Sequence, residues 1–108
     1  MPRPPRHSVY VVLLDPEVIH DRRFAAANPQ HRRGAPCVYV GMTGLTPDQR
    51  FANHKSGVRA NRYVKRYGLR LERTLYRHLN PMTYRQAQEW EEELAESLRR
   101  RGYAVWQN

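Results

Sequence analysis

Several kinds of residue are scarce in this sequence, and each scarcity excludes a class of protein. The single cysteine, Cys37, excludes an internal disulfide and a zinc site built from clustered cysteines. No apolar run reaches the roughly 18 residues of a membrane-spanning helix. The first residues also lack the apolar stretch of a signal peptide. We therefore expect no membrane partner and a location in the reducing cytoplasm.

Acidic residues are scarce as well. The chain has 10 Asp and Glu residues against 19 Lys and Arg residues, for a formal net charge of +9. Five of the acids lie within residues 89–96, so the remaining 100 residues carry 19 bases and 5 acids, a net of +14. A surface this basic attracts phosphate and releases its counterions. The charge predicts a nucleic-acid partner, with acidic lipid or simple solubility as the alternatives.

The length of 108 residues suits one domain. Residues 1–8 hold three prolines and two arginines and are predicted to be a loose basic tail, so that residues 9–108 form the domain. A domain of this size has a thin core. A polar residue on a core-facing stripe therefore needs a specific explanation.

Three strands are expected from runs of β-branched and aromatic residues that end at turn signals. The first two are most simply antiparallel and are separated by a long connection, residues 15–36, with room for a short helix over residues 18–27. The expected strands cover residues 8–14, 37–41 and 69–76.

Three further helices are expected, two of them from capping boxes. Thr46 with Gln49, and Thr83 with Gln86, have the spacing of such boxes. The fold class is therefore α/β (α+β): a three-stranded, mostly antiparallel sheet flanked by helices, in the order strand, strand, helix, helix, strand, helix. The three helices are expected over residues 46–56, 60–67 and 83–101.

One acid of the last helix lies on the wrong face. Glu91 is four residues after Ala87 and three before Leu94, in the middle of the apolar stripe. An unpaired buried carboxylate costs several kcal/mol, so it needs an arginine or a cation beside it. The alternatives are a structural salt bridge and a metal-binding or catalytic acid.

Arg50 and His54 are four residues apart on the helix over 46–56 and share a face, while Phe51 turns toward the core. Neither side chain complements the charge of the other. Both suit a phosphate, to which Arg donates parallel hydrogen bonds and His donates or relays a proton. The alternative is a solvated face.

A basic run follows, interleaved with Tyr63 and Tyr67. It is typical of a surface that grips a nucleic-acid backbone and offers stacking platforms, although Tyr63, Val64 and Tyr67 could equally form the core face of the short helix. The candidate nucleic-acid contacts in it are Lys55, Arg59, Arg62, Lys65 and Arg66.

These pieces, in this order, resemble the GIY-YIG nuclease superfamily over residues 8–108. Ser8-Val9-Tyr10 stands for the first motif and Tyr39-Val40-Gly41 for the second. Thr43 lies where members often place Ser or Thr, and Arg50 follows Tyr39 by eleven residues. Some members have a histidine one turn later, as His54 is here. The stretch 87–91 looks like the last helix of the family, which selects Glu91 again.

The resemblance implies a small standalone nuclease with Tyr10, Tyr39, Arg50, His54 and Glu91 as catalytic residues. Glu91 would bind one Mg²⁺ or Mn²⁺, Arg50 would neutralise the scissile phosphate, and Thr43 would join the nucleic-acid contacts. Tyr39 is expected to face the substrate, with Gly41 allowing the backbone to approach closely. The activity implied is metal-dependent hydrolysis of DNA, single-stranded or structured.

Three departures from the family pattern keep other functions open. Met42 stands where some relatives carry a catalytic lysine, Ser8 replaces a glycine, and the late asparagine of the family has only Asn108 as a candidate. The alternatives are a catalytically inactive nucleic-acid-binding module and an RNA-directed nuclease.

Overall fold

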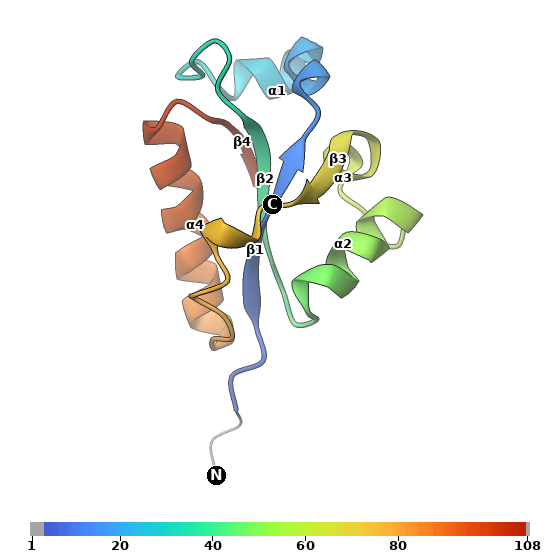
Figure 1. The fold of residues 1–108 in the computed structure, drawn as a ribbon, viewed down its shortest axis with the longest axis vertical. Coiled ribbons are helices and arrows are strands. Elements are labelled where there is room, and N and C mark those ends of the chain that lie inside the picture. The colour runs from blue at the N-terminus through green and yellow to red at the C-terminus, as the bar shows by residue number, and fades with distance from the viewer. Residues whose placement is uncertain (1–3, 108) are drawn as a thin grey trace.

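The computed structural model describes residues 4–107, which form an α+β domain around a four-stranded mixed sheet (Figure 1). The strands are β1 (Ser8–Leu14), β2 (Cys37–Thr43), β3 (Gly68–Leu71) and β4 (Ala104–Gln107). The α-helices are α1 (Arg22–Ala26), α2 (Pro47–Ser56), α3 (Arg62–Tyr67) and α4 (Tyr84–Arg100). Two short 3₁₀ helices complete the fold, η1 (Pro16–His20) and η2 (Arg73–Leu75).

The sheet has the order β3-β1-β2-β4. β1 is antiparallel to both β2 and β3, whereas β4 is parallel to β2. In Figure 1, α4 lies on one side of the sheet and α2 and α3 lie on the other. The two central strands are therefore covered on both faces, which is why six of the seven residues of β1 and of β2 are buried.

The prediction of three strands is wrong, because β4 was missed. Its four residues, AVWQ, begin two positions after Gly102, and their partner β2 lies more than 60 residues away in the sequence. Such a short run has no alternation of its own to reveal it. Its placement depends on Asn28, whose side-chain Oδ1 accepts from the N–H of Val105 at 2.7 Å.

Other boundaries differ by a few residues. The third strand stops at Leu71, and η2 replaces its second half. The helix expected over 18–27 is split into η1 and α1 by Asp21, which caps α1 by accepting from the N–H of Phe24. Both predicted capping boxes are confirmed, one at the start of α2 and one at the start of α4.

The tail predicted over residues 1–8 is shorter in the structure. Ser8 already belongs to β1, and His7 exchanges two backbone hydrogen bonds with Met82, at 2.9 and 2.8 Å. Residues 1–3 of the predicted tail lie outside the described residues. Across residues 4–107, every helix is too short or too polar to cross a bilayer.

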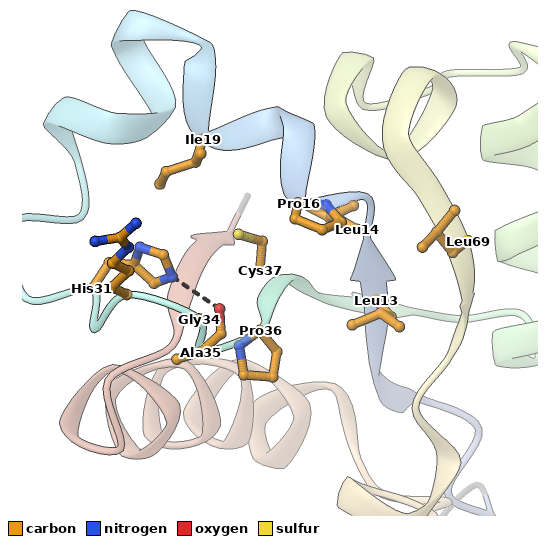
Figure 2. Close-up of a pocket in the computed structure, with 11 residues that line it drawn as sticks. Leu13, Leu14, Pro16, Ile19, His31, Gly34, Ala35, Pro36, Cys37 and Leu69 are labelled. Carbon is orange, nitrogen blue, oxygen red and sulfur yellow. Dashed lines mark hydrogen bonds between the residues drawn. The ribbon is translucent and has the colours of Figure 1, made fainter.

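The connection over residues 15–36 forms a wall of a largely apolar cavity of about 630 Å³ (Figure 2). Leu13 and Leu14 at the end of β1, Cys37 at the start of β2, and Leu69 of β3 line it together with the connection. None of the predicted site residues lines this cavity, which lies at the opposite end of β1 and β2 from Gly41 and Thr43.

Candidate active site

The two motif tyrosines lie against each other on one face of the sheet. Tyr10 pairs with Gly41 across β1 and β2, and Tyr39 lies two residues before Gly41, so both side chains project to the same side. Their ring centroids are 6.0 Å apart, and each residue is only 1% exposed. The fold thus buries a pair of phenol side chains from two adjacent strands.

Gly41 makes this pair possible. A Cβ at position 41 would lie 2.7 Å from the Tyr10 hydroxyl oxygen and 2.8 Å from a ring carbon of Tyr39. The space above Gly41 is therefore filled by the tyrosine rings themselves. This differs from the expectation that Gly41 leaves room for a substrate.

His54 of α2 completes a hydrogen-bonded chain beneath the helix. It is 0% exposed, and its Nε2 lies 2.8 Å from the Tyr10 hydroxyl oxygen. Its Nδ1 accepts a hydrogen bond from the backbone N–H of Asn61 at 3.0 Å. Because Nδ1 is occupied as an acceptor, the imidazole proton is on Nε2, which donates to Tyr10. The Tyr10 hydroxyl keeps its own proton, and Tyr39 is its neighbouring hydrogen-bond partner.

The charges around these groups keep them neutral. Burial, and then the positive charge of Arg50, lowers the pKa of His54 to about 4. Burial, and then the neighbouring Tyr39, raises the pKa of Tyr10 far above its ordinary value. The pKa of Tyr39 is also raised, chiefly by burial. At neutral pH the cluster therefore consists of two phenols and an uncharged imidazole, with one cation beside them.

That cation, Arg50, is half-buried on α2, one turn before His54. Its two terminal nitrogens donate to the backbone carbonyls of Val58 and Arg59, at 3.2 and 2.8 Å. These bonds use two of the five N–H groups of the guanidinium and leave the others available. Arg50 also lines a cleft of about 560 Å³ whose other walls are Thr43, Leu45, Asn53, Val58 and Arg59.

Glu91 is buried on α4, as its place in the apolar stripe predicted, and is 8% exposed. None of the ion pairs among residues 4–107 involves its carboxylate, so the salt-bridge alternative has no partner there. Burial, and then the charge of Glu92, raises its pKa. The side-chain amide of Gln107, whose Oε1 accepts from Arg99 at 2.8 Å, partly offsets that rise.

The structure thus brings four of the five candidates together and places the fifth across the sheet. Tyr10, Tyr39, Arg50 and His54 lie together beneath α2. Glu91 belongs to α4, the helix on the other side of the sheet (Figure 1). Glu91 lines a separate depression of about 190 Å³ with Met42, Gln88, Glu92 and Gln107. Its charge still reaches the Tyr39 hydroxyl and contributes to that raised pKa.

The donor set around Glu91 fits a weakly held Mg²⁺ or Mn²⁺. Residues 4–107 contain no cluster of three or more His, Cys, Asp or Glu side chains that could hold an ion together. Mg²⁺, however, usually keeps several waters and binds through one or two carboxylates. A desolvated carboxylate without a cationic partner, with Glu92 beside it, meets that need.

Several predicted nucleic-acid contacts also have structural roles. The ammonium of Lys55 donates to the carbonyls of Lys65 and Gly68, at 2.9 and 3.0 Å, and so holds α2 against the end of α3. Thr43 is buried, and its Oγ1 accepts from the N–H of Leu45 at 3.0 Å. Arg59 and Lys65 are exposed.

The aromatic residues of the basic run pack toward the core, Tyr63 fully and Tyr67 in part. Tyr63 is 2% exposed, packs against Phe24, and donates from its hydroxyl to Asp21 at 2.9 Å, so it belongs to the core. Tyr67 is half-buried. Arg62 lies 4.7 Å from the Tyr63 ring centre, and Arg66 lies 5.1 Å from that of Tyr67. Each arginine thus covers an aromatic ring with its own guanidinium.

Two contributors to the site were not predicted. The backbone N–H of Asn61 fixes the His54 tautomer, and the one available signal was Asn61 as a good helix N-cap, which it is for α3. Gln107 carried no signal, because β4 was missed. Asn108, the candidate for a late asparagine, lies outside the described residues.

Neither a protein-family model, nor a curated protein, nor a solved structure matches this chain. Its function must therefore be inferred from its own residues and their geometry.

Proposed function

We propose that this protein is a metal-dependent DNA endonuclease of the GIY-YIG type that hydrolyses phosphodiester bonds in single-stranded or structured DNA in the cytoplasm. The observation that carries the proposal is the buried bond from His54 Nε2–H to the Tyr10 hydroxyl, beside Arg50 and an arginine-lined cleft. Motif residues that are distant in the sequence meet there in one hydrogen-bonded cluster. The excess of Lys and Arg over Asp and Glu outside the acidic stretch 89–96 supports a nucleic-acid substrate.

The neutral phenols serve best as hydrogen-bond donors. Tyr10 accepts from His54 and keeps its own proton, which it can donate to Tyr39 or, in the proposed complex, to a phosphoryl oxygen. Its raised pKa disfavours the phenolate and hence a role as a simple base. Arg50 has free N–H groups with which to neutralise the phosphoryl oxygens. His54 is a positioning residue that acts through Tyr10.

A divalent ion held by Glu91 would acidify a bound water and offset negative charge at the phosphate. Glu91, with Glu92 beside it, would hold this ion on the α4 side of the sheet. The influence of Glu91 on Tyr39 shows that the two sides are electrostatically coupled.

One observation favours a second function, a nucleic-acid-binding module without catalysis. Tyr10 and Tyr39 are each 1% exposed, and Tyr10 has an internal partner, as in a purely structural cluster. Met42 occupies the position at which relatives with a catalytic lysine would place it. An RNA-directed nuclease shares all the chemistry above, so the substrate panel must include RNA.

The test is cleavage of end-labelled single-stranded DNA, duplex DNA and RNA of one sequence, each with Mg²⁺, with Mn²⁺ and with EDTA. The proposal predicts metal-dependent products from DNA that disappear in EDTA. Gel shifts on the same strands without products under any condition would instead identify the binding module. Products from RNA alone would identify the RNA-directed alternative.

A further inference from the structure

The cleft beside Arg50 combines two kinds of surface that a nucleotide needs. Leu45 and Val58 line it and are 45% and 54% exposed, among the most exposed large apolar residues of the described chain. Arg50 and Arg59 line the same cleft and bring positive charge. Isolated exposed apolar residues need no explanation, but two of them beside two arginines in one depression do.

The wall that carries Val58 and Arg59 is held rigidly. Val58 donates its N–H to the Asn53 carbonyl at 2.9 Å, while Arg50 donates to the carbonyls of both Val58 and Arg59. Arg59 has a φ of 46°, a left-handed conformation that costs a non-glycine residue on the order of 1 kcal/mol. The turn keeps this strained shape because Arg50 and Asn53 tie it to α2. A site that is already ordered loses less freedom when a ligand binds.

We propose that this cleft binds one unpaired nucleotide, with its base against Leu45 and Val58 and its phosphate toward Arg50 and Arg59. The volume of about 560 Å³ lies within the range of small-ligand pockets, roughly 300–1,000 Å³. A base in a duplex is stacked on both faces and paired at its edge, so only a splayed or single-stranded base presents a face to apolar side chains. The inference rests on the proposed function and narrows its substrate to DNA with unpaired nucleotides.

The cleft is tested by binding alone, in EDTA, so that cleavage plays no part. A fluorescently labelled single strand is titrated by anisotropy, together with a set of strands in which one nucleotide at a time lacks its base. The proteins are wild type, Val58→Ala, Leu45→Ala and, as the matched control, Leu69→Ala. Leu69 is 54% exposed, like Val58, but lies in β3 on the rim of the separate apolar cavity.

We expect Val58→Ala and Leu45→Ala each to weaken binding of the intact strand about fivefold, and Leu69→Ala to leave it unchanged. For wild type, one abasic position should cost a similar factor, and at that position the Val58→Ala variant should lose nothing further. Equal affinity of wild type and Val58→Ala for the intact strand would contradict nucleotide binding in the cleft. An equal loss of wild-type affinity on every abasic strand would contradict it as well. Either result would leave the nuclease proposal untouched, because cleavage is measured separately. If instead DNA is not cleaved but the abasic position still weakens binding as expected, the nuclease proposal fails and the nucleotide-binding cleft stands.

Discussion

The two faces of the sheet both bury ionisable groups under a helix, but they treat them in opposite ways. Under α2, uncharged His54 has a partner for each ring nitrogen, the Tyr10 hydroxyl and the Asn61 N–H. Under α4, Glu91 has no ion-pair partner among the described residues, and burial raises its pKa. A hydrogen-bonded network positions atoms, whereas a buried carboxylate without an ion-pair partner among the described residues favours a cation beside it. We propose that the α2 face positions the reacting groups and that the α4 face binds the ion.

Replacing His54 by Leu should have the largest effect, because it removes the centre of the hydrogen-bonded network under α2. The substitution keeps much of the volume but removes the partners of the Tyr10 hydroxyl and of the Asn61 N–H. We expect a loss of about 3–4 kcal/mol in the free energy of unfolding, measured with urea. Ala52→Leu, on the exposed side of the same helix, is the control and should change stability little. Equal stability of the two variants would show that the network contributes nothing.

The pH dependence of stability sharpens the comparison, since the two faces carry opposite signs. The pKa of His54 falls from an ordinary 6.5 to about 4 on folding, so the unfolded chain binds more protons between these values. The folded state is stabilised by the neutral form of His54. This contribution to the free energy of unfolding is fully present above pH 6.5 and falls by on the order of 2–3 kcal/mol as the pH drops toward 4. Urea titrations of wild type and His54→Leu should show this loss in wild type alone.

Glu91 has the reverse sign. Its pKa is raised above an ordinary 4.5, so the folded chain binds more protons and stability falls as the pH rises above that value. Glu91→Gln should therefore be more stable than wild type at pH 7, and the difference should vanish below pH 4. Adding Mg²⁺ should raise the melting temperature of wild type but not of the variant. A variant that is less stable than wild type at pH 7 would mean that the carboxylate has a partner after all.

Gly41→Ala tests the close packing of the two phenols on the α2 face. The added Cβ would meet Tyr10 at 2.7 Å and Tyr39 at 2.8 Å, so the rings or the strand must move. We expect a loss of about 2 kcal/mol in the free energy of unfolding. Gly44→Ala is the matched control, because its Cβ would meet only His7, at 3.5 Å. If both variants unfold alike, the tyrosine pair is not tightly packed.

The smallest effect concerns the strained turn that borders the cleft. Arg59→Gly and Arg59→Ala remove the same charge, but only glycine adopts the φ of 46° without strain. The glycine variant should be about 1 kcal/mol more stable than the alanine variant. Thermal melts of the two variants at one pH provide the measurement, and a more stable alanine variant would contradict the left-handed turn.

Local sequence signals predicted much of this structure. Features that depend on residues far apart in the sequence were not predicted, for a physical reason. The caps at Thr46 and Thr83 and the buried position of Glu91 follow from neighbours within a few residues. β4 depends on pairing with β2 more than 60 residues away, and its four residues carry no pattern of their own. The neutral state of His54 was equally invisible, because it depends on the Asn61 backbone and on burial that only the packed helices create.

The same division holds for the site. The sequence proposed five catalytic residues, and the structure brings four of them together. It did not predict that Gly41 makes room for tyrosine rings, or that Glu91 lies across the sheet from them. Which face a side chain occupies depends on where α2 and α4 pack, and that is a property of the whole fold.

The most direct test of the central claim is single-turnover cleavage of single-stranded DNA by wild type and by Glu91→Gln, at protein concentrations that saturate the strand in Mg²⁺. Saturation removes differences in binding, so the rates report the contribution of the carboxylate to the chemical step. The nuclease account predicts cleavage by wild type and a rate at least about 100-fold lower in the variant, with binding retained. Equal rates, or bound DNA that neither protein cleaves, would contradict it.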